Sequence, residues 1–260
     1  MSGDEIIALI VSALLAGYWL QWIFLWCPRG LKLERNPAGR WFAQIMPLMV
    51  TLLLLAVLRC WSSHDVRSSV LYLGFYSLMG LAWLTVTVTA FGALGFDLRY
   101  DWIDSRNPAA ALCGAGLMLG VTLAFGGANV GDGPGWWVVV FSALLSTGAL
   151  WLGLVLLNFS ADMMERVTVN RDTSLATRLA GFFLCGGALA GRAVAGDWVS
   201  VSGTVTDFLH AGRPLFAAML ALAAVEFAAR RTRLPLGVSV ALVMAELMAS
   251  GGYLLWLGVW

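Results

Sequence analysis

The sequence predicts an all-α fold, a polytopic membrane helix bundle of about eight transmembrane helices built from repeated two-helix hairpins. Of 260 residues, 60% are hydrophobic and only 12% are charged, whereas a soluble domain usually carries about 25% charged residues. The mean hydropathy is +0.82. Apolar runs recur at about 20 residues, the helix length that spans a hydrocarbon core. Because these runs do not alternate apolar and polar residues, as barrel strands would, we predict helices.

The expected spans follow the apolar runs in chain order. They cover 6–27, 41–61, 69–96, 108–130, 135–160, 179–197, 208–229 and 235–258. Charged residues mark the ends of the sixth and seventh spans, and the polar segment 199–206 between them is expected to form a turn. The whole chain, 1–260, is therefore expected to be a single membrane domain.

The orientation is predicted from the basic residues, which gather in cytoplasmic connectors. Twelve of the 16 basic residues fall in the connectors after the first, third, fifth and seventh spans. They are Arg29, Lys32, Arg35, Arg40, Arg99, Arg106, Arg166, Arg171, Arg178, Arg230, Arg231 and Arg233. We therefore expect both termini to be periplasmic, in the inner (plasma) membrane of a bacterium, with tryptophans forming belts at both membrane interfaces.

Patterns typical of enzymes and of metal sites are missing from the sequence. The four cysteines stand singly in or beside apolar runs, and the chain has only two histidines. Without C-x-x-C spacing or a His cluster we expect no metal site, and no cofactor-binding loop is readable. The connectors are too short for a catalytic domain, so no enzymatic activity is expected. A basic tail is also missing, so nucleic acid is not an expected partner.

An internal repeat divides the chain into four hairpin units, 6–61, 69–130, 135–197 and 208–258. Arg35-Asn36-Pro37-Ala38 recurs as Arg106-Asn107-Pro108-Ala109. A second offset, of 65 residues, relates 106–132 to 171–197 without a gap. Units with two spans share one orientation, so we expect them to be related by an axis along the membrane normal.

The repeated motif has two interpretations. Asn at an N-cap accepts bonds from the first N–H groups of a helix, and Pro at N1 has no N–H to leave unpaired. Asn36, Asn107 and, in the third unit, Asp172 are therefore expected to begin helices. The alternative is an anion or headgroup site at the helix N-terminus, beside Arg35 and Arg106.

At this repeat the sequence resembles the YjfL-like family of bacterial inner-membrane proteins over about 68–198. The stretches that carry the resemblance are Asn107 to Ala111 with Gly116 to Gly120, and Met164 to Ala176 with Gly181 to Gly191. The second copy has Asp172 in place of Asn and Leu175 in place of Ala. The resemblance implies a four-helix core with added hairpins, and a role in the cell envelope, where relatives lie near envelope-stress genes.

Glu246 is the main candidate for a functional side chain inside the membrane. It lies near the middle of the eighth span, where a carboxylate is costly and should face a partner or a water-filled cavity. Its alternatives are a neutral Glu bonded across a helix interface and a group that handles a proton or cation. Thr85 and Thr89 share a helix face and either line a path or bond back to their own helix. Glu226 is expected to pair with Arg230, one turn later.

Two functions are consistent with these features. The first is a channel- or transporter-like protein for an ion or small solute, indicated by the parallel repeats and Glu246. The second is a membrane scaffold or subunit that recruits cytoplasmic envelope-stress partners through its basic connectors. The expected partners are the lipid bilayer and either further copies of the chain or other membrane subunits. A hydrated cavity at Glu246 would favour transport, and a dry core would favour the scaffold.

Overall fold

The computed structural model of the chain describes residues 1–21, 37–229 and 234–258, and this part contains helices but no strand. Short elements connect the long helices. The long helices are α1 (Gly3–Gln21), α2 (Pro37–Trp61), α4 (Val70–Phe91), α5 (Pro108–Gly127), α6 (Trp136–Ala161), α8 (Thr173–Val194), α10 (Arg213–Ala228) and α11 (Leu236–Leu257). The short ones are α3 (His64–Ser68), η3 (Gly92–Leu94), η4 (Leu98–Asp104), α7 (Met163–Thr168) and α9 (Val201–Ala211).

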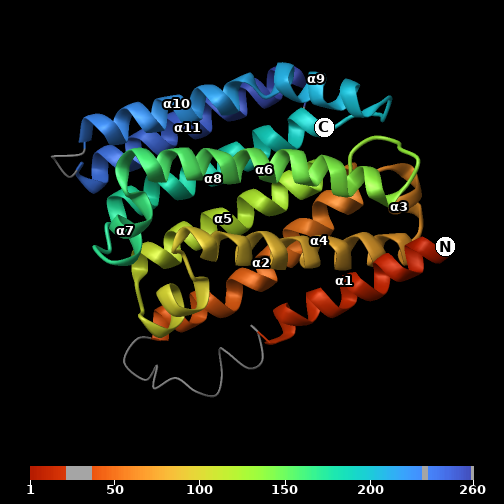
Figure 1. The fold of residues 1–260 in the computed structure, drawn as a ribbon, viewed down its shortest axis with the longest axis horizontal. Coiled ribbons are helices and arrows are strands. Elements are labelled where there is room, and N and C mark those ends of the chain that lie inside the picture. The colour runs from red at the N-terminus through yellow and green to blue at the C-terminus, as the bar shows by residue number, and fades with distance from the viewer. Residues whose placement is uncertain (22–36, 230–233, 259–260) are drawn as a thin grey trace.

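The long helices run roughly along the longest axis of the molecule (Figure 1). Within the described residues, five helices are long and apolar enough to cross a membrane, and α9 with α10 makes a sixth if the bent pair is one span. One end of the bundle carries η4 and α7, and is called the α7 end. The other carries α3 and the N-terminus, and is called the α3 end. This arrangement establishes the polytopic helix bundle that the composition predicts.

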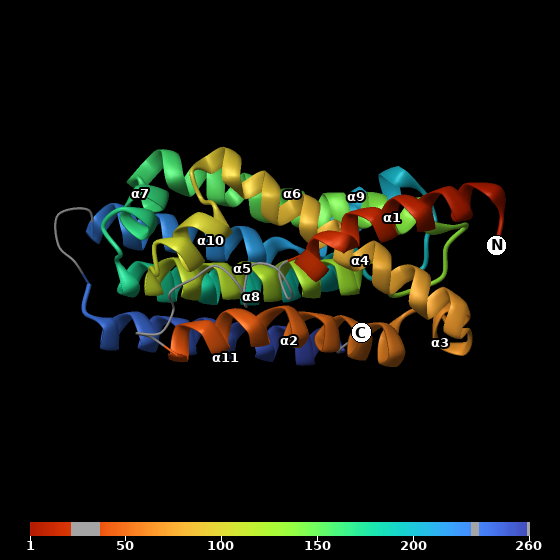
Figure 2. The same cartoon turned by 90° about the horizontal axis from the view of Figure 1, so that it is seen from below.

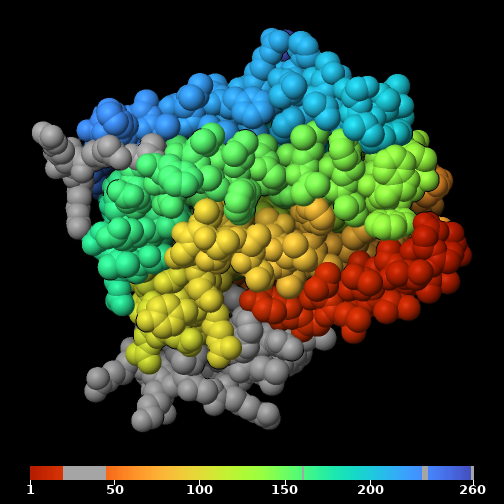
Figure 3. Space-filling view, viewed as in Figure 1, coloured from red at the N-terminus to blue at the C-terminus, as the bar shows by residue number. Residues whose placement is uncertain are grey.

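Two helices, α5 and α8, form the centre of the bundle. They pack closely against each other along their length. Figure 2 shows them between two outer layers, with α2 and α11 on one face and α1 and α6 on the other. In the space-filling view the order across one face is α1, α4, α6 and α10 (Figure 3). In this arrangement α2 packs on α5 as α11 packs on α8, and α1 packs on α4 as α10 packs on α6.

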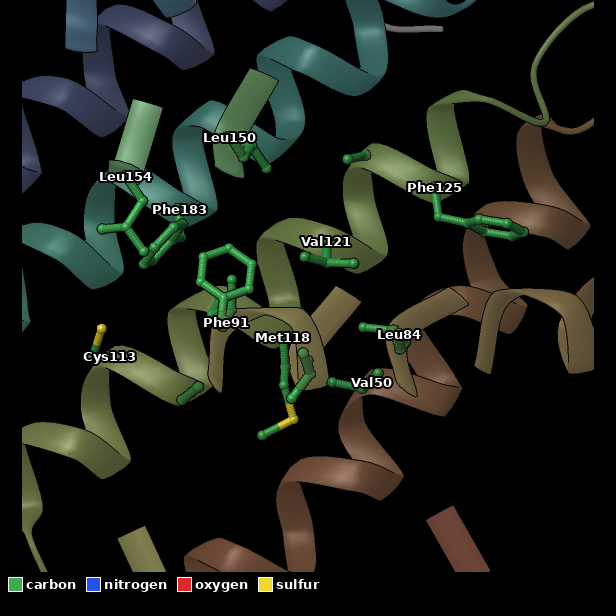
Figure 4. Packing of buried hydrophobic residues seen from close by; sticks show 14 of the residues in the cluster. Val50, Leu84, Phe91, Cys113, Met118, Val121, Phe125, Leu150, Leu154 and Phe183 are labelled. Carbon is green, nitrogen blue, oxygen red and sulfur yellow. The ribbon is translucent and has the colours of Figure 1, made fainter. Parts of the chain in front are cut away.

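Glycines allow α5 and α8 to approach until their backbones touch. A Cβ at Gly120 would meet the carbonyl of Phe183, and one at Gly187 would meet the carbonyl of Gly120. Gly127 is equally close to the carbonyl of Gly191. Large side chains fill the space around this contact, and the rings of Phe91 and Phe183 meet edge to face at 5.8 Å between centroids (Figure 4). The centre of the bundle is therefore closely packed protein.

The 65-residue offset seen in the sequence recurs in the backbone. Asn107 N–H donates to the carbonyl of Asp101, and Asp172 N–H donates to that of Arg166, at 3.2 and 3.0 Å. The residues just before these caps share a left-handed conformation, with φ of 51° at Arg106 and 52° at Arg171. η4 and α7 occupy corresponding positions before α5 and α8. The two connectors therefore fold alike, although η4 is a π-helix and α7 an α-helix.

Two of the expected boundaries are wrong. The sixth span begins at Thr173 instead of 179, so Arg178 lies inside α8. The segment expected to be a polar turn, 199–206, mostly belongs to helix α9, which begins at Val201. Ser200 caps α9 by accepting from Gly203 N–H at 3.0 Å, and Thr204 and Thr206 donate to carbonyls one turn back. These polar side chains are satisfied by their own helix, so the helix tolerates them.

The seventh span is bent. α9 and α10 meet at an angle of 51°. Gly212 lies between them, and Pro214 takes one of the first positions of α10, where a missing N–H costs no helical bond. Tyr253 of α11 donates its hydroxyl to the carbonyl of Ala211 at 3.1 Å, beside the bend. The bend is therefore supported by the neighbouring helix.

Candidate functional site

A chain of buried ion pairs crosses the α7 end of the helices. Its centre is Glu226 on α10, whose side chain is completely buried. One carboxylate oxygen accepts from Arg178 Nε at 2.5 Å, and the other accepts from Arg166 Nη1 at 2.8 Å. Arg166 Nη2 also lies 3.0 Å from Asp172. Arg178 completes the chain by donating to the hydroxyl of Ser239 on α11. Ion pairs thereby join α7, α8 and α10, and a hydrogen bond to Ser239 adds α11.

Asp172 connects this network to the start of α8. Its side chain accepts from Leu175 N–H at 3.0 Å, which caps the helix, and from Arg166. Burial alone would raise the pKa of Asp172, but the hydrogen bonds from Leu175 and Arg166 outweigh it, and the pKa lies below its ordinary value. Asp172 is therefore a charged carboxylate at neutral pH.

The network is electrically neutral, because two arginines face two carboxylates. Transferring an ion from water into a protein interior is costly, and a buried ion pair offsets this cost only with good geometry and further hydrogen bonds. Here both oxygens of Glu226 are occupied, and Arg178 also donates to the carbonyl of Ser174 at 3.1 Å. With every charge paired, this network is better suited to holding helices together than to binding a solute.

Glu226 has partners from distant parts of the chain. The sequence predicted a pair with Arg230, which lies outside the described residues. Within the described residues, Glu226 pairs with Arg166 and Arg178, 60 and 48 residues away in the chain. The sequence signal that was missed is Arg178, which lies about one and a half turns after the N-cap Asp172. An arginine buried in an apolar helix needs a carboxylate partner, so its position predicts a buried Asp or Glu nearby.

Glu246 lines a cavity of about 450 Å³ between α8, α10 and α11. The carboxylate side chain is half-buried. Arg178 contributes to the same wall, as does Ser250, one turn after Glu246. The remaining lining is apolar: Leu189, Pro214, Ala217, Ala218, Ala221, Leu222, Val225, Leu242, Val243, Ala245 and Ala249. Because Arg178 is already paired with Glu226, Glu246 is the one acidic side chain that this cavity presents without an ion pair within the described residues.

The two threonines lie elsewhere in the bundle. Thr85 Oγ1 donates to the carbonyls of Leu81, in its own helix, and of Leu15, in α1, at 3.0 and 3.3 Å. Thr89 Oγ1 donates to the carbonyl of Thr85 at 2.7 Å. Neither residue lines the cavity at Glu246. Thr85 instead joins α4 to α1 by a hydrogen bond across the interface.

The asparagine motif forms a buried cap. Asn107 is fully buried, and its Oδ1 accepts from Ala109 and Ala110 N–H at 2.9 and 3.3 Å. Its Nδ2 donates to the carbonyls of Val167 and Thr168, at 2.7 and 3.0 Å. Two N–H groups that an anion would need are thus taken by the cap. Arg106 precedes it in a left-handed conformation, and Asn36 lies outside the described residues.

The geometry leaves no candidate metal centre among the described residues, where no group of three His, Cys, Asp or Glu side chains comes together. The fold and these sites define a multi-pass helical membrane protein with a neutral charge network at the α7 end and a cavity that contains Glu246.

A comparison with protein families matches residues 64–194 to DUF350, a domain of unknown function. The match covers half of the chain, and the protein belongs to this family. It includes α4, α5, α6 and α8, so α10 and α11, with Glu226 and Glu246, lie beyond it. No curated protein and no solved structure matches the chain.

Proposed function

We propose that this protein is a channel- or transporter-like protein that moves a cation or a small polar solute across a bacterial inner membrane. The observation that carries this proposal is the cavity of about 450 Å³ whose wall holds Glu246 between α8, α10 and α11. A carboxylate at bilayer depth is costly and usually marks a path for ions or protons. The apolar remainder of the wall would leave Glu246 as the group that selects for positive charge.

The packed centre supports placing the path at this cavity. Between α5 and α8 the backbones are in contact at Gly120 and Gly187, which leaves no room for a solute. α10 contacts α8 and α6, whereas α11 packs mainly on α8. A solute would therefore pass between the C-terminal hairpin and the family core, while the charge network secures their α7 end.

Replacing Glu246 with glutamine should strongly reduce cation or proton flux and leave the fold intact, because glutamine keeps the shape but not the charge. The measurement is uptake into vesicles reconstituted with the full chain, under an imposed membrane potential, for protons, Na⁺ and K⁺ in turn. We expect a loss of at least about tenfold, the effect of removing about 1.4 kcal/mol of binding. Glu165→Gln, on the exposed part of α7, is the matched control and should retain wild-type flux. Wild-type flux in Glu246→Gln would reject the proposal.

A membrane scaffold or subunit that recruits envelope-stress partners is the second candidate, and the outer face of α11 favours it. Apolar side chains cover that face and are exposed in the single chain, including Leu236, Val240, Met244 and Met248. Exposed apolar surface inside a membrane suits either lipid or another helix. If Glu246→Gln and Glu246→Leu both support full activity in cells, the scaffold function is favoured over transport.

The proposed topology places the α7 end in the cytoplasm and both termini in the periplasm. Arg99, Arg106, Arg166 and Arg171 belong to the η4 and α7 connectors at that end, which is the basis for the proposal. In intact cells, a cysteine replacing Arg99 should resist a membrane-impermeant thiol reagent, and one replacing Asp197 should react. The opposite pattern would invert the topology. The YjfL-like resemblance over 68–198 supports the inner membrane as the location.

A further inference from the structure

A second, smaller cavity lies at the α3 end of the bundle, and none of its lining residues lines the cavity at Glu246. Its volume is about 50 Å³, and it is enclosed by the turn after α5, the segment after α8, and parts of α4, α6 and α9. Oxygen-bearing side chains make up much of its wall: Ser63, Tyr76, Asn129, Asp132, Ser142 and Thr204. A water molecule occupies about 30 Å³ in the liquid, so the space suits one small ion or one or two waters.

Asn129 is the residue that indicates a ligand. Its side chain is 4% exposed, and its Nδ2 donates to the carbonyl of Phe125 at 2.7 Å. This bond fixes the orientation of the amide, because an exchange of its oxygen and nitrogen would set two acceptors against each other. Oδ1 is then buried without a hydrogen-bond partner. A buried acceptor left without a partner costs about 1–3 kcal/mol, so a bound group is expected beside it.

The charge around the cavity favours a cation. Asp132 is an acidic residue of the wall, and it is exposed at the rim. Ala128, the C-cap of α5, and Val194, the last residue of α8, also line this cavity, and a helix C-terminus carries partial negative charge. No arginine or lysine belongs to the wall among the described residues.

We infer that this cavity binds a small monovalent cation, of which Na⁺ is the representative, through Asn129 Oδ1, hydroxyl oxygens and Asp132. Oxygen ligands suit hard cations. Among the described residues Asp132 is the one acidic residue of the wall, while the carboxylate of Asp197 lies beside it and accepts from Asp132 N–H at 2.8 Å. One acidic residue in the wall balances one positive charge, which favours a monovalent over a divalent ion. By joining the turn after α5 to the segment after α8, where Gly196 N–H donates to the carbonyl of Val130 at 3.0 Å, the ion would hold the α3 ends of the central helices together.

The test is the thermal stability of the purified full-length protein in detergent, with NaCl against choline chloride at equal ionic strength. Saturating Na⁺ should raise the Tm of the wild type by about 5 °C, as expected for a ligand well above its Kd. Asn129→Ala should lose this shift, and Asn129→Asp, which adds a carboxylate, should show it at lower Na⁺. Asn170→Ala, on an exposed asparagine at the opposite end, should retain the wild-type shift.

Three results would overturn the inference. Equal Tm values in NaCl and choline chloride would mean that water fills the cavity. A Na⁺ shift that persists in Asn129→Ala would place the ion elsewhere. A shift with CaCl₂ but not NaCl, lost in Asn129→Ala, would reject the monovalent assignment. The Asn129→Ala comparison is repeated in the Glu246→Gln background, where Na⁺ bound at the proposed transport site cannot contribute to the shift, so this inference and the transport proposal fail independently.

Discussion

Replacing Gly120 with valine should remove most of the folded protein from the membrane. The Cα of Gly120 faces the carbonyl of Phe183, and the added Cβ would collide with backbone instead of a movable side chain. Adding a larger side chain to a packed core costs about 1–3 kcal/mol when neighbouring side chains can move to make room. Here the two central helices must separate, so we expect a cost of at least about 3 kcal/mol and a fall in Tm of about 10 °C.

Gly148→Val is the matched control for this result. Gly148 lies in the middle of α6, and a Cβ there would meet nothing within 4 Å. Both variants place the same β-branched side chain in a membrane helix, so their difference isolates the contact between α5 and α8. The measurements are monodisperse yield after extraction and Tm in the same detergent. A Gly120→Val protein as stable as Gly148→Val would show that α5 and α8 are not in backbone contact.

Glu226→Leu should destabilise the protein by about 3–5 kcal/mol, the cost of breaking a buried ion pair from one side. The substitution leaves the buried Arg178 guanidinium with hydrogen bonds to Ser174 and Ser239 but without a counter-ion. Arg166 is affected less, because it keeps Asp172 at 3.0 Å and is partly exposed. The expected readouts are a lower folded yield and a lower Tm.

The double variant Arg178→Met with Glu226→Leu should recover most of this loss. Two apolar side chains of similar length replace the pair, and such replacements are often neutral or stabilising. Glu165→Leu, on the exposed side of α7, should change stability by no more than about 0.5 kcal/mol. If the double variant is as unstable as Glu226→Leu alone, the arginine is not the source of the cost, and the network has been misinterpreted.

Features set by local sequence could be predicted. The long helices lie where the apolar runs lie, because the span length depends only on nearby composition. The cap at Asn107 follows from an Asn-Pro pair, and the two bonds that Oδ1 accepts from Ala109 and Ala110 N–H are made within three residues. Glu246 could be singled out from sequence, because a lone carboxylate in an apolar run is costly wherever its helix packs.

Features that depend on distant partners could not be predicted. Arg178 would end an apolar run if it were isolated, so the sixth span was expected to begin after it. Its partner Glu226 belongs to another helix, and only the packing of α10 on α8 brings the two together. The unpartnered Oδ1 of Asn129 could not be predicted either, because the sequence shows a polar turn and not which amide atom is buried.

The charge network around Glu226 has a consequence for how the chain inserts into the membrane during synthesis. Arg178 leaves the ribosome 48 residues before Glu226, so α8 reaches the insertion machinery while its counter-ion is still unmade. An arginine in the centre of an inserting helix costs about 2.5–3.5 kcal/mol, less near its end. Stable insertion of α8 should therefore wait for α10, and nascent chains stopped before 226 should expose Arg178 to the aqueous side. The α10–α11 hairpin would then be required for α8 to insert stably while the protein is being made.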